Sequence, residues 1–354
     1  MDTFWQGKKV LLTGHTGFKG SWLALWLQQA GADVVGFALE PDTEPSLFEL
    51  ARVADGMTSV IGDLRDPASI REVVVEHRPE IVLHLAAQAI VRASYDDPVA
   101  TYATNVMGTA HLLEAIRQHP SARAVVVVTS DKCYDNLEIE RGYREDDALG
   151  GRDPYSSSKG CTELVARSYR DSFLADAKPP VALATARAGN VVGGGDWGRD
   201  RLVPDIMRAF LSGDPLRIRN PAATRPWQHV LDPLSGYLSL AEHLWRDGPA
   251  FSEAWNFGPA DETPLPVGAM VERILERWDQ PITVESDPGP HPHEHHLLRL
   301  DPSKAEQRLG WKARLLLPET LDWIVGWTRA YRDSGDMRAF TLKQIRRYQS
   351  SMTR

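Results

Sequence analysis

The sequence predicts an α/β protein with a Rossmann-like, doubly wound parallel sheet and a smaller C-terminal α/β lobe. Three observations lead to this prediction. Short β-branched runs alternate with longer helical patterns from Lys9 to about Arg187, the first run leads into a glycine-rich turn, and the alternation ends after Arg187. Such alternation is typical of parallel strands that are joined by crossover helices.

Six apolar runs are predicted as the strands of this sheet. Parallel strands that are covered by helices on both faces are expected to be nearly all apolar. The runs are KVLLT (9–13), DVVGFA (33–38), MTSVI (57–61), EIVLHLA (80–86), ARAVVVVTS (122–130) and PVALATAR (180–187). Helices are predicted to begin near Phe18, Pro67, Pro98 and Tyr155, and a proline in the first turn of two of them pre-sets the helical φ angle.

Two parts of the chain are distinguished by this pattern. We assign residues 1–186, with a return segment near 222–256, to the Rossmann-like domain. Residues 187–221 and 257–354 are assigned to a substrate-binding lobe, which starts with the glycine-rich loop GNVVGGGDWGRD. Neither a Gly/Ser-rich nor an acidic linker separates the two parts, so we expect them to pack closely around a cleft.

The composition indicates which classes of binding partner to expect. The 354 residues are 42% hydrophobic and 25% charged, which is enough to bury a full core. A net charge of −8, with no basic stretch, argues against binding along a nucleic-acid backbone and favours small molecules. The longest apolar runs, such as Ala124 to Val128, are far shorter than the roughly 20 residues of a membrane-spanning helix. With only two cysteines and no apolar leader, a cytoplasmic protein is expected.

A glycine-rich turn follows the first predicted strand and precedes an amphipathic helix. Its G-x-x-G-x-x-G spacing favours the binding of a dinucleotide pyrophosphate, because glycines allow close approach and the helix N-terminus presents free N–H groups. A plain glycine turn is the alternative. The candidate cofactor-binding residues of the turn are Gly14, Thr16, Gly17, Phe18, Lys19 and Gly20.

Further cofactor contacts are predicted at the ends of the next strands. Glu40 is the candidate partner of the ribose hydroxyls, although Ala38 and Leu39 intervene between it and the strand. Asp63, next to Leu64, is expected to accept the adenine amino group, with a helix N-cap ahead of Pro67 as the alternative. The small residues of Leu85-Ala86-Ala87-Gln88 leave room for a cofactor, or serve tight packing alone.

The catalytic candidates are a tyrosine and a lysine at i and i+4 of one predicted helix. Tyr155 and Lys159 share a helix face. A cation close to a phenol, with the positive nicotinamide ring of an oxidised cofactor nearby, lowers the phenol pKa from roughly 10 toward neutrality. Tyr155 could then remove a hydroxyl proton while hydride leaves the same carbon. Ser130, at the carboxyl end of the fifth predicted strand, would project its hydroxyl toward that carbon. The pair alone arises often by chance on surface helices, but its order after the turn and the serine is the expected one.

In these motifs the chain resembles the extended short-chain dehydrogenase/reductase family over nearly its full length. The resemblance implies NAD as the cofactor and a triad of Ser130, Tyr155 and Lys159. It also implies that Asn105, in TNVMGT, supports the site and contacts the cofactor; a polar residue that caps a helix kink is the alternative. Family members commonly form dimers through the helices that begin at Pro98 and Tyr155, so a homodimer or homotetramer is expected.

The two residues that follow Ser130 make the resemblance more specific, to nucleotide-sugar dehydratases. Sugar-nucleotide 4,6-dehydratases in general carry Asp-Glu there, whereas this chain has Asp131-Lys132. That departure is similar to the members that use CDP-glucose, as are the segments GHTGFKGSWL, EPSLFEL, TSDKCYDN, ARAGNVVGGGDW and RPWQHVLDPL. The implied product is CDP-4-keto-6-deoxyglucose, a precursor of deoxysugars for a lipopolysaccharide O-antigen.

The hypothesis for the reaction assigns a role to each of these two residues. Asp131, as a protonated acid, assists loss of the 6-hydroxyl, and Lys132 is the position-matched base for the C5 proton. Lys132 can act as a base only if it is neutral. The alternative is electrostatic, with a charged Lys132 that stabilises an enolate or pairs with Asp131.

Candidate substrate-binding residues lie mainly in the second part of the chain. Arginine side chains could give charge-assisted contacts to a diphosphate, and the alternative for each is a plain surface residue. The candidates are Gln88, Asn190, Arg201, Arg219 and Arg225, and Asp196, Trp197 and Arg199 could also line the cleft. A metal is not expected, although His291, His293, Glu294, His295 and His296 superficially suggest a metal site.

Two rival functions remain from the sequence. One is a 4-epimerase, or a dehydratase that acts on a dTDP-, UDP- or GDP-hexose. Asp131 argues against the epimerase, which needs no acid at C6. The other is a non-catalytic NAD-binding sensor on the same fold, which the intact Ser130, Tyr155 and Lys159 disfavour.

Overall fold

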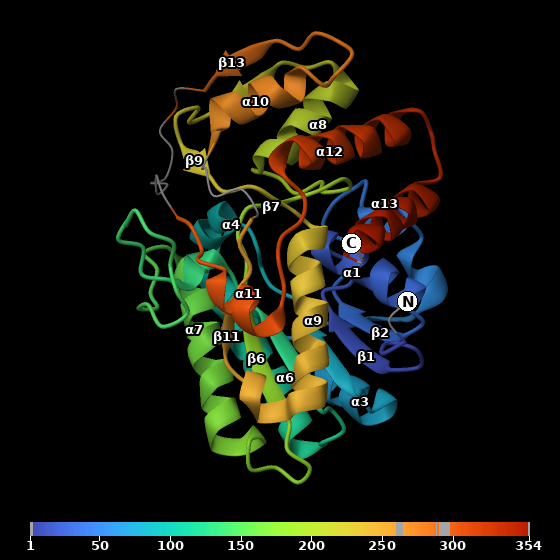
Figure 1. Ribbon diagram of the computed structural model, residues 1–354, viewed down its shortest axis with the longest axis vertical. Helices are drawn as coiled ribbons and strands as arrows, with labels where there is room; N and C mark the ends of the chain where they lie inside the picture. The colour runs from blue at the N-terminus through green and yellow to red at the C-terminus, as the bar shows by residue number, and fades with distance from the viewer. Residues whose placement is uncertain (1–2, 260–264, 288, 290–297, 353–354) are drawn as a thin grey trace.

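A seven-stranded sheet organises the computed structural model, which describes residues 3–259, 265–287, 289 and 298–352 (Figure 1). Neighbouring strands are all parallel and follow the order β11-β6-β5-β4-β1-β2-β3. The strands are β1 (Lys9–Thr13), β2 (Asp33–Ala38), β3 (Thr58–Ile61), β4 (Ile81–His84), β5 (Ala124–Val128), β6 (Ala182–Arg187) and β11 (Ala254–Asn256). The six predicted strands and the Rossmann-like fold are therefore confirmed.

The order of the strands reverses between β1 and β4. Both strands lie in the middle of the sheet, and chain connections leave them in opposite directions. In open parallel sheets a ligand binds beyond the carboxyl ends of the strands at such a switch point. The glycine turn after β1 and the segment after β4 both lie there.

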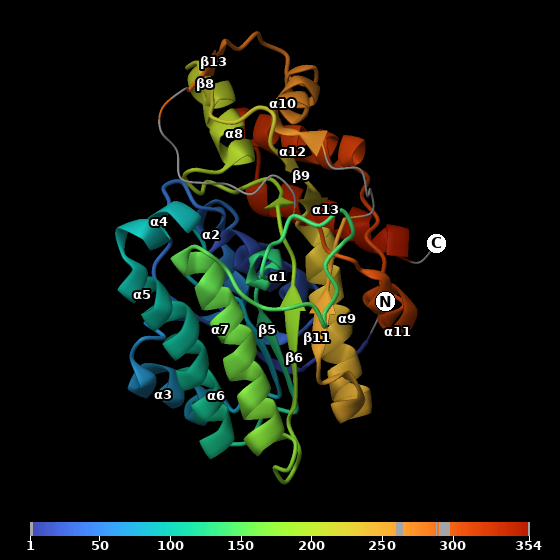
Figure 2. The same cartoon turned by 90° about the vertical axis from the view of Figure 1, so that its left-hand side faces the viewer.

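Helices cover both faces of the sheet. Successive side chains of a strand point to opposite faces, so Val10 and Leu12 pack in one core cluster and Leu11 in the other. One face carries α3 (Pro67–His77), α6 (Gly108–Gln118) and α7 (Pro154–Tyr169), which lie side by side in Figure 2. The other face carries α1 (Phe18–Gln29), α9 (Leu231–Asp247) and α13 (Met337–Met352).

The predicted helix starts have identifiable caps. Asp66 accepts a hydrogen bond from the Ala68 N–H and precedes Pro67, and Asp153 caps α7 in the same way before Pro154. The N-cap of α3 is thus Asp66, and the alternative that placed Asp63 in this role is wrong. The remaining short helices are α2 (Leu47–Leu50), α4 (Val91–Asp96), α5 (Pro98–Tyr102), α11 (Ser303–Leu309), η1 (Val53–Gly56), η3 (Asp131–Cys133), η4 (Arg170–Leu174) and η5 (Gly248–Phe251).

One turn of π-helix, η2 (Ala103–Met107), joins α5 to α6. A π turn inserts one residue into the helical repeat and is frequent at functional sites. Here it frees the Asn105 carbonyl, which accepts hydrogen bonds from the hydroxyls of Thr109 and Thr162. The kink therefore ties the helix to α7.

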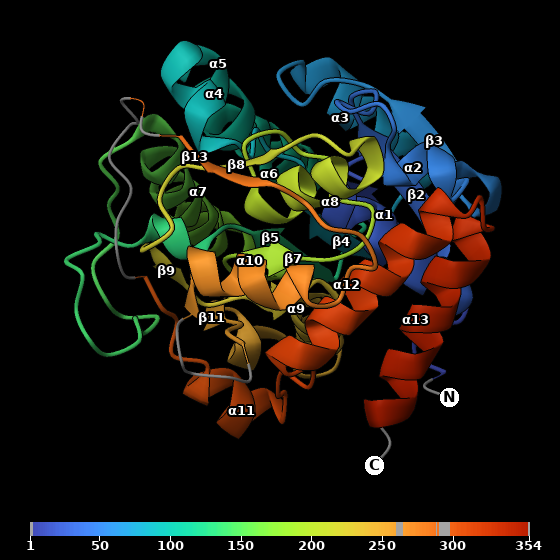
Figure 3. The ribbon, with the colours of Figure 1, turned by 90° about the horizontal axis from the view of Figure 1, so that it is seen from above.

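A smaller group of elements lies above the sheet in Figures 1 and 3. Its core is formed by α8 (Leu202–Ser212), α10 (Val267–Leu275) and α12 (Leu317–Arg332). Three two-stranded sheets complete it: β7 (Val191–Val192) with β10 (Gln228–His229), β8 (Leu216–Ile218) with β13 (Val284–Ser286), and β9 (Thr224–Arg225) with β12 (Leu265–Pro266). The helix α13 that follows returns to the sheet and packs on α1.

A buried carboxylate holds α13 in its position against the sheet domain. Asp232, at the start of α9, accepts hydrogen bonds of 2.8 Å from the Arg314 N–H and from the Tyr348 hydroxyl of α13. Burial raises the pKa of Asp232 from 3.8 to about 6, because the hydrogen bonds offset only part of the lost hydration. Because the folded state binds the proton of Asp232 more tightly than the unfolded state does, protonated Asp232 contributes its full stabilisation below about pH 4. This stabilisation is lost as the pH rises through about 6.

We predict that Asp232→Asn flattens the pH dependence of stability. A shift of about two pKa units corresponds to about 3 kcal/mol, so wild type should lose up to this amount relative to the variant between pH 4 and pH 7.5. Urea denaturation at both pH values measures the difference. The exposed Asp214→Asn variant serves as the control, and parallel pH dependences of wild type and Asp232→Asn would contradict the role of Asp232.

None of the helices in the described part of the chain combines the length and apolar character needed to cross a bilayer. Within the same residues, no group of three or more histidine, cysteine or acidic side chains is arranged to hold a metal ion. The cluster from His291 to His296 lies outside the described residues.

Candidate active site

The glycine turn packs directly on the end of β4. Gly14 has a φ of +78°, and a Cβ atom there would lie 2.7 Å from the Ala86 nitrogen. A Cβ atom on Gly20 would lie 2.0 Å from the Gly14 oxygen, so the turn and α1 touch through backbone atoms alone. Gly17 caps α1 without a side-chain hydrogen bond. These features fit a pyrophosphate held by backbone N–H groups at the start of α1.

Asn105 and Gln88 are bound to other parts of the protein. The Asn105 amide accepts from the Gln88 N–H at 2.8 Å and donates to the Gln88 oxygen at 3.0 Å and to Ser158 of α7 at 2.8 Å. The Gln88 amide donates to Thr101 and accepts from the Ile90 N–H. Asn105 thus holds the segment after β4 beside α7, and the contacts predicted for Asn105 with cofactor and for Gln88 with substrate stay predictions.

The predicted triad meets at the ends of β5 and α7. Ser130 caps η3 and donates a hydrogen bond of 2.9 Å to Asp131, and its hydroxyl acts on the pKa of the neighbouring Tyr155 phenol. Tyr155 and Lys159 are both buried on α7, and the Lys159 ammonium donates to the Val128 oxygen at 3.5 Å. The structure thus brings Ser130, Tyr155 and Lys159 together in the way that the sequence predicts.

The ionisation of Tyr155 depends on burial and on the charges nearby. Burial raises the pKa of Tyr155 to about 12, while the neighbouring Ser130 hydroxyl and the charge of Arg201 oppose this rise. The predicted lowering toward neutrality also requires the positive nicotinamide ring of an oxidised cofactor, so it stays a prediction for the protein with bound NAD. Burial also lowers the pKa of Lys159 to about 8.

Asp131 and Lys132 differ in their surroundings. Asp131 is buried, and a Cβ atom built on Gly189 would lie 1.9 Å from its Oδ2 atom, so Gly189 leaves the space that this carboxylate occupies. Lys132 is half-buried and makes no ion pair with Asp131 in the described part of the chain. This contradicts the alternative in which Lys132 pairs with Asp131.

Two further cations face Asp131 and the phenol. Arg201, at the start of α8, pairs with the buried Asp196 at 3.2 Å and acts electrostatically on Tyr155. Lys19 interacts with Arg201, Lys159 and Asp131, and burial with these neighbouring cations lowers the pKa of Lys19 to about 8. Trp22 holds this arrangement together, since its indole N–H donates to the Gly194 oxygen at 3.0 Å. Lys19 and Arg201 therefore present positive charge between α1 and α8.

Three further candidates for cofactor binding follow β2 and β3. Glu40 is exposed, and Asp63 forms an ion pair of 2.6 Å with Arg65, which lowers its pKa. Leu64 is buried, and its carbonyl accepts a hydrogen bond from His111.

The remaining substrate candidates are tied to the loops around α8. Asn190 has a φ of +50°, and its carbonyl accepts from the Gln228 N–H. Arg219 pairs with Asp200 at 3.1 Å, while Arg225 donates to the Thr224 oxygen within β9. No described contact links these three to the triad, so their roles stay predictions.

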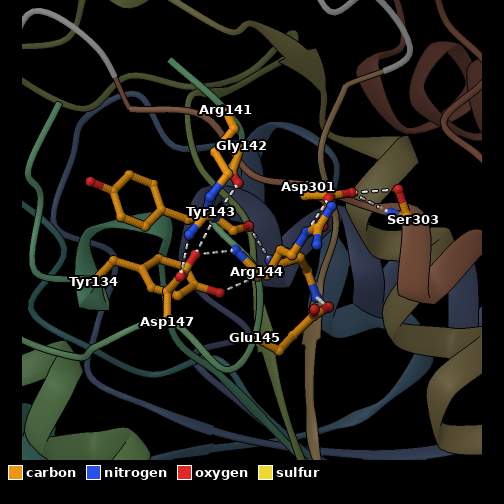
Figure 4. A network of polar contacts seen from close by, with 10 residues as sticks. Tyr134, Arg141, Gly142, Tyr143, Arg144, Glu145, Asp147, Asp301 and Ser303 are labelled. Atoms are coloured by element: carbon orange, nitrogen blue, oxygen red, sulfur yellow. Dashed lines mark hydrogen bonds and ion pairs between the residues drawn. The ribbon is translucent and has the colours of Figure 1, made fainter. Parts of the chain in front are cut away.

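A buried network of polar side chains lies behind the triad and was not predicted from the sequence. Glu163 and Arg187 form an ion pair of 2.9 Å beneath Lys159, and both side chains are almost fully shielded from water. The segment after β5 joins this network through Tyr134 and is fastened by polar contacts such as those of Arg144 with Asp147 and Asp301 (Figure 4). The repeated four-residue spacing of Tyr155, Lys159 and Glu163 was the signal that could have revealed Glu163.

Comparison with known proteins agrees with this geometry. The sequence model of the family described as GDP-mannose 4,6 dehydratase matches residues 11–323. The chain belongs to the GDP-mannose 4,6 dehydratase family. This confirms the predicted membership of the extended short-chain dehydrogenases/reductases.

Proteins similar to this chain differ in the nucleotide that their names carry. A CDP-glucose 4,6-dehydratase of Salmonella typhimurium is 53% identical over 354 residues, which are 99% of each chain. A dTDP-glucose 4,6-dehydratase of Xanthomonas campestris is 25% identical over 89% of this chain and 92% of its own. The dTDP-glucose 4,6-dehydratase of Bacillus anthracis, solved in complex with NAD, has a TM-score of 0.76 at 21% identity and covers 93% of this chain and 99% of its own. This last likeness shows the fold.

We predict that Gly189→Ala abolishes catalysis without unfolding the protein. The added methyl group would displace the Asp131 carboxylate, and a misplacement of about 1 Å in a catalytic group can cost about 100-fold in rate. Turnover of nucleotide sugars and the thermal midpoint should be measured together. Gly326→Ala is the matched control, since its Cβ atom has no neighbour closer than 4.0 Å, and full activity of Gly189→Ala would contradict the placement of Asp131.

Proposed function

We propose that this chain is an NAD-dependent hydro-lyase that converts CDP-glucose into CDP-4-keto-6-deoxyglucose and water. One observation carries the reaction type: the buried side chain of Asp131 accepts a hydrogen bond from Ser130 and acts electrostatically on the Tyr155 phenol. The 53% identity with a CDP-glucose 4,6-dehydratase supports the choice of substrate.

The residues around the glycine turn fit NAD. The free N–H groups at the start of α1 suit the pyrophosphate, and Ala86 and Ala87 leave space along the end of β4 for the cofactor. A bound NAD would supply the hydride acceptor for C4 of the sugar and the hydride donor for C6. Solved NAD complexes of a dTDP-glucose 4,6-dehydratase and of the Thermus thermophilus UDP-glucose 4-epimerase share the fold, with TM-scores of 0.76 and 0.78.

Tyr155 is the base for the 4-hydroxyl proton. It acts as the phenolate, which takes the 4-hydroxyl proton and becomes the phenol. The positive charges of Arg201 and of Lys159, one helical turn away on α7, favour the phenolate. Oxidation at C4 gives a ketone, which makes the C5 proton acidic. Elimination then becomes feasible.

Asp131 and Lys132 complete the elimination. A base removes the C5 proton, the C6–O bond breaks, and Asp131 supplies the proton with which the 6-hydroxyl leaves as water. Lys132 lies next to Asp131 and, being half-buried, is the candidate base. Arg201, and in the outer loops Asn190, Arg219 and Arg225, are the proposed contacts of the diphosphate.

The alternatives differ in their products. A 4-epimerase would return an inverted sugar with the 6-hydroxyl retained, and a dehydratase for another nucleotide would leave CDP-glucose unchanged. A non-catalytic sensor would bind NAD without turnover. Incubation of the purified chain with CDP-, dTDP-, UDP- and GDP-hexoses, with and without NAD, therefore tests the proposal. A 4-keto-6-deoxy product from CDP-glucose supports it, and each other outcome contradicts it.

We predict that Lys132→Ala slows removal of the C5 proton more than oxidation at C4. The variant should retain formation of reduced cofactor on addition of CDP-glucose, while exchange of the C5 proton with solvent deuterium falls about 100-fold or more. NMR of the recovered sugar measures the exchange. Wild-type exchange in Lys132→Ala would assign the base elsewhere.

The chain is further proposed to form a homodimer or a homotetramer through the face that bears α5 and α7. Four large apolar side chains are exposed there: Val99 of α5, Met107 of η2, Leu164 of α7 and Phe173 of η4. Val99 is 77% exposed and Leu164 is 56% exposed. The helices α5 and α7 lie on the same side of the sheet in Figure 2. Exposed apolar residues gathered on one face are typical of an interface between subunits.

We predict that Leu164→Glu weakens this association. Light scattering coupled to gel filtration should show a lower mass for the variant than for wild type at equal concentration. Leu316→Glu is the matched control, because Leu316 is similarly exposed at the start of α12. Equal masses for wild type and Leu164→Glu would contradict the proposed interface.

A further inference from the structure

Glu163 and Arg187 place two opposite charges in the interior of the Rossmann-like domain. The Nε and Nη2 atoms of Arg187 donate to the two oxygens of Glu163, each at 2.9 Å. Glu163 also accepts hydrogen bonds from Thr129 at 2.5 Å and from Thr185 at 2.7 Å. Two carboxylate oxygens thus have four donors, which is the satisfaction that a buried charge requires.

The partners of this ion pair come from the elements that build the active site. Thr129 directly precedes Ser130 at the end of β5, and Arg187 closes β6 two residues before Gly189, which makes room for Asp131. Arg187 also donates to the Tyr134 hydroxyl at 2.6 Å. The pair therefore joins α7 to the ends of both strands and to the segment after β5.

Glu163 lies on the same face of α7 as the catalytic pair. Tyr155, Lys159 and Glu163 follow one another at intervals of four residues, so each side chain is a neighbour of the next. All three are buried.

The charge of Lys159 depends on the groups around it. These are Lys19 from α1, His84 from β4, Cys133 from η3 and Glu163 from α7. Burial lowers the pKa of His84 to about 3 and raises that of the Cys133 thiol, so both are neutral near pH 7, and Lys19 is a cation. Of these four neighbours, Glu163 is the anion that favours the charged form of Lys159.

A buried ion pair often contributes little to stability. The free energy lost on desolvation of the two charges is often larger than that gained from their attraction, and apolar residues of the same volume can give an equally stable protein. The pair nevertheless occupies the position directly behind the triad, where a fixed negative charge has a use for catalysis. This argues for a role beyond packing.

We propose that Glu163 is a positioning residue, which fixes Ser130 against α7 through Thr129 and, with its charge balanced by Arg187, keeps Lys159 protonated beside Tyr155. The catalytic part of this inference rests on the proposed function, because it concerns the same proton transfer. Glu163 itself does not contact the reacting atoms.

The pH profile of Glu163→Gln tests this role. Removal of the anion lowers the pKa of Lys159 below its value of about 8, so the activity that needs charged Lys159 should be lost at lower pH. We expect the alkaline limb of kcat/KM to move down by about one pH unit or more, and kcat at pH 7 to fall about tenfold or more. Glu114→Gln, which removes a surface carboxylate of α6, should leave both unchanged.

A second variant tests the placement of Ser130 separately from the charge of Lys159. It also keeps the proposal testable if Glu163→Gln does not fold. Thr129→Val deletes the hydrogen bond to Glu163 but keeps the ion pair. Here kcat should fall about tenfold while the alkaline limb stays at the wild-type pH. Wild-type kcat in Thr129→Val, or an unshifted limb in a folded Glu163→Gln, would overturn the corresponding part of the proposal.

A measurement without substrate distinguishes this inference from the proposed function. Trace acetic anhydride labels neutral lysine, so the acetylated fraction of Lys159, read by mass spectrometry against the exposed Lys312, reports the Lys159 pKa. The pKa should be lower in Glu163→Gln than in wild type. If wild type turns over no nucleotide sugar, the proposed function fails, and this titration alone still decides whether Glu163 holds the charge of Lys159; an unchanged titration overturns that role.

Discussion

Glu163 and Arg187 meet in the interior of the sheet domain, where neither side chain reaches water. The strands β5 and β6 and the helix α7 each contribute a hydrogen-bonding partner to this pair. Since separation of the two charges would leave each unpaired in a medium of low dielectric constant, the three elements cannot shift independently. The positions of Ser130 and Lys159 follow from this constraint.

The second constraint is the contact of the glycine turn with the end of β4. Gly14 and Ala86 touch through backbone atoms, and Asn105 fastens the next residues of that segment to α7. The turn, the strand end and the catalytic helix thus form one continuous surface. Lys19 and Arg201 bring positive charge to it from α1 and α8, where the phosphates of a cofactor and a nucleotide sugar would be neutralised.

Patterns local to one segment predicted most of this architecture. The apolar runs gave the strands of the sheet domain apart from β11, and proline with aspartate marked where α3 and α7 begin. The triad was predictable because strand end, turn and i, i+4 pair occur in a known order. Glu163 was not, since its partner Arg187 lies 24 residues away on another strand and a charged residue in a helix is ordinarily taken as exposed. The pKa of Tyr155 also depends on burial, which no local pattern reveals.

In the proposed reaction, one carbon-bound hydrogen of the sugar moves from C4 to C6 within a site built by Ser130, Asp131 and Tyr155. CDP-glucose labelled with deuterium at C4, converted by wild-type protein in ordinary water, tests this directly by NMR and mass spectrometry of the product. The proposed reaction predicts deuterium at C6 and a solvent proton at C5 of the 4-keto-6-deoxy sugar. Deuterium retained at C4, or released to solvent, would contradict it.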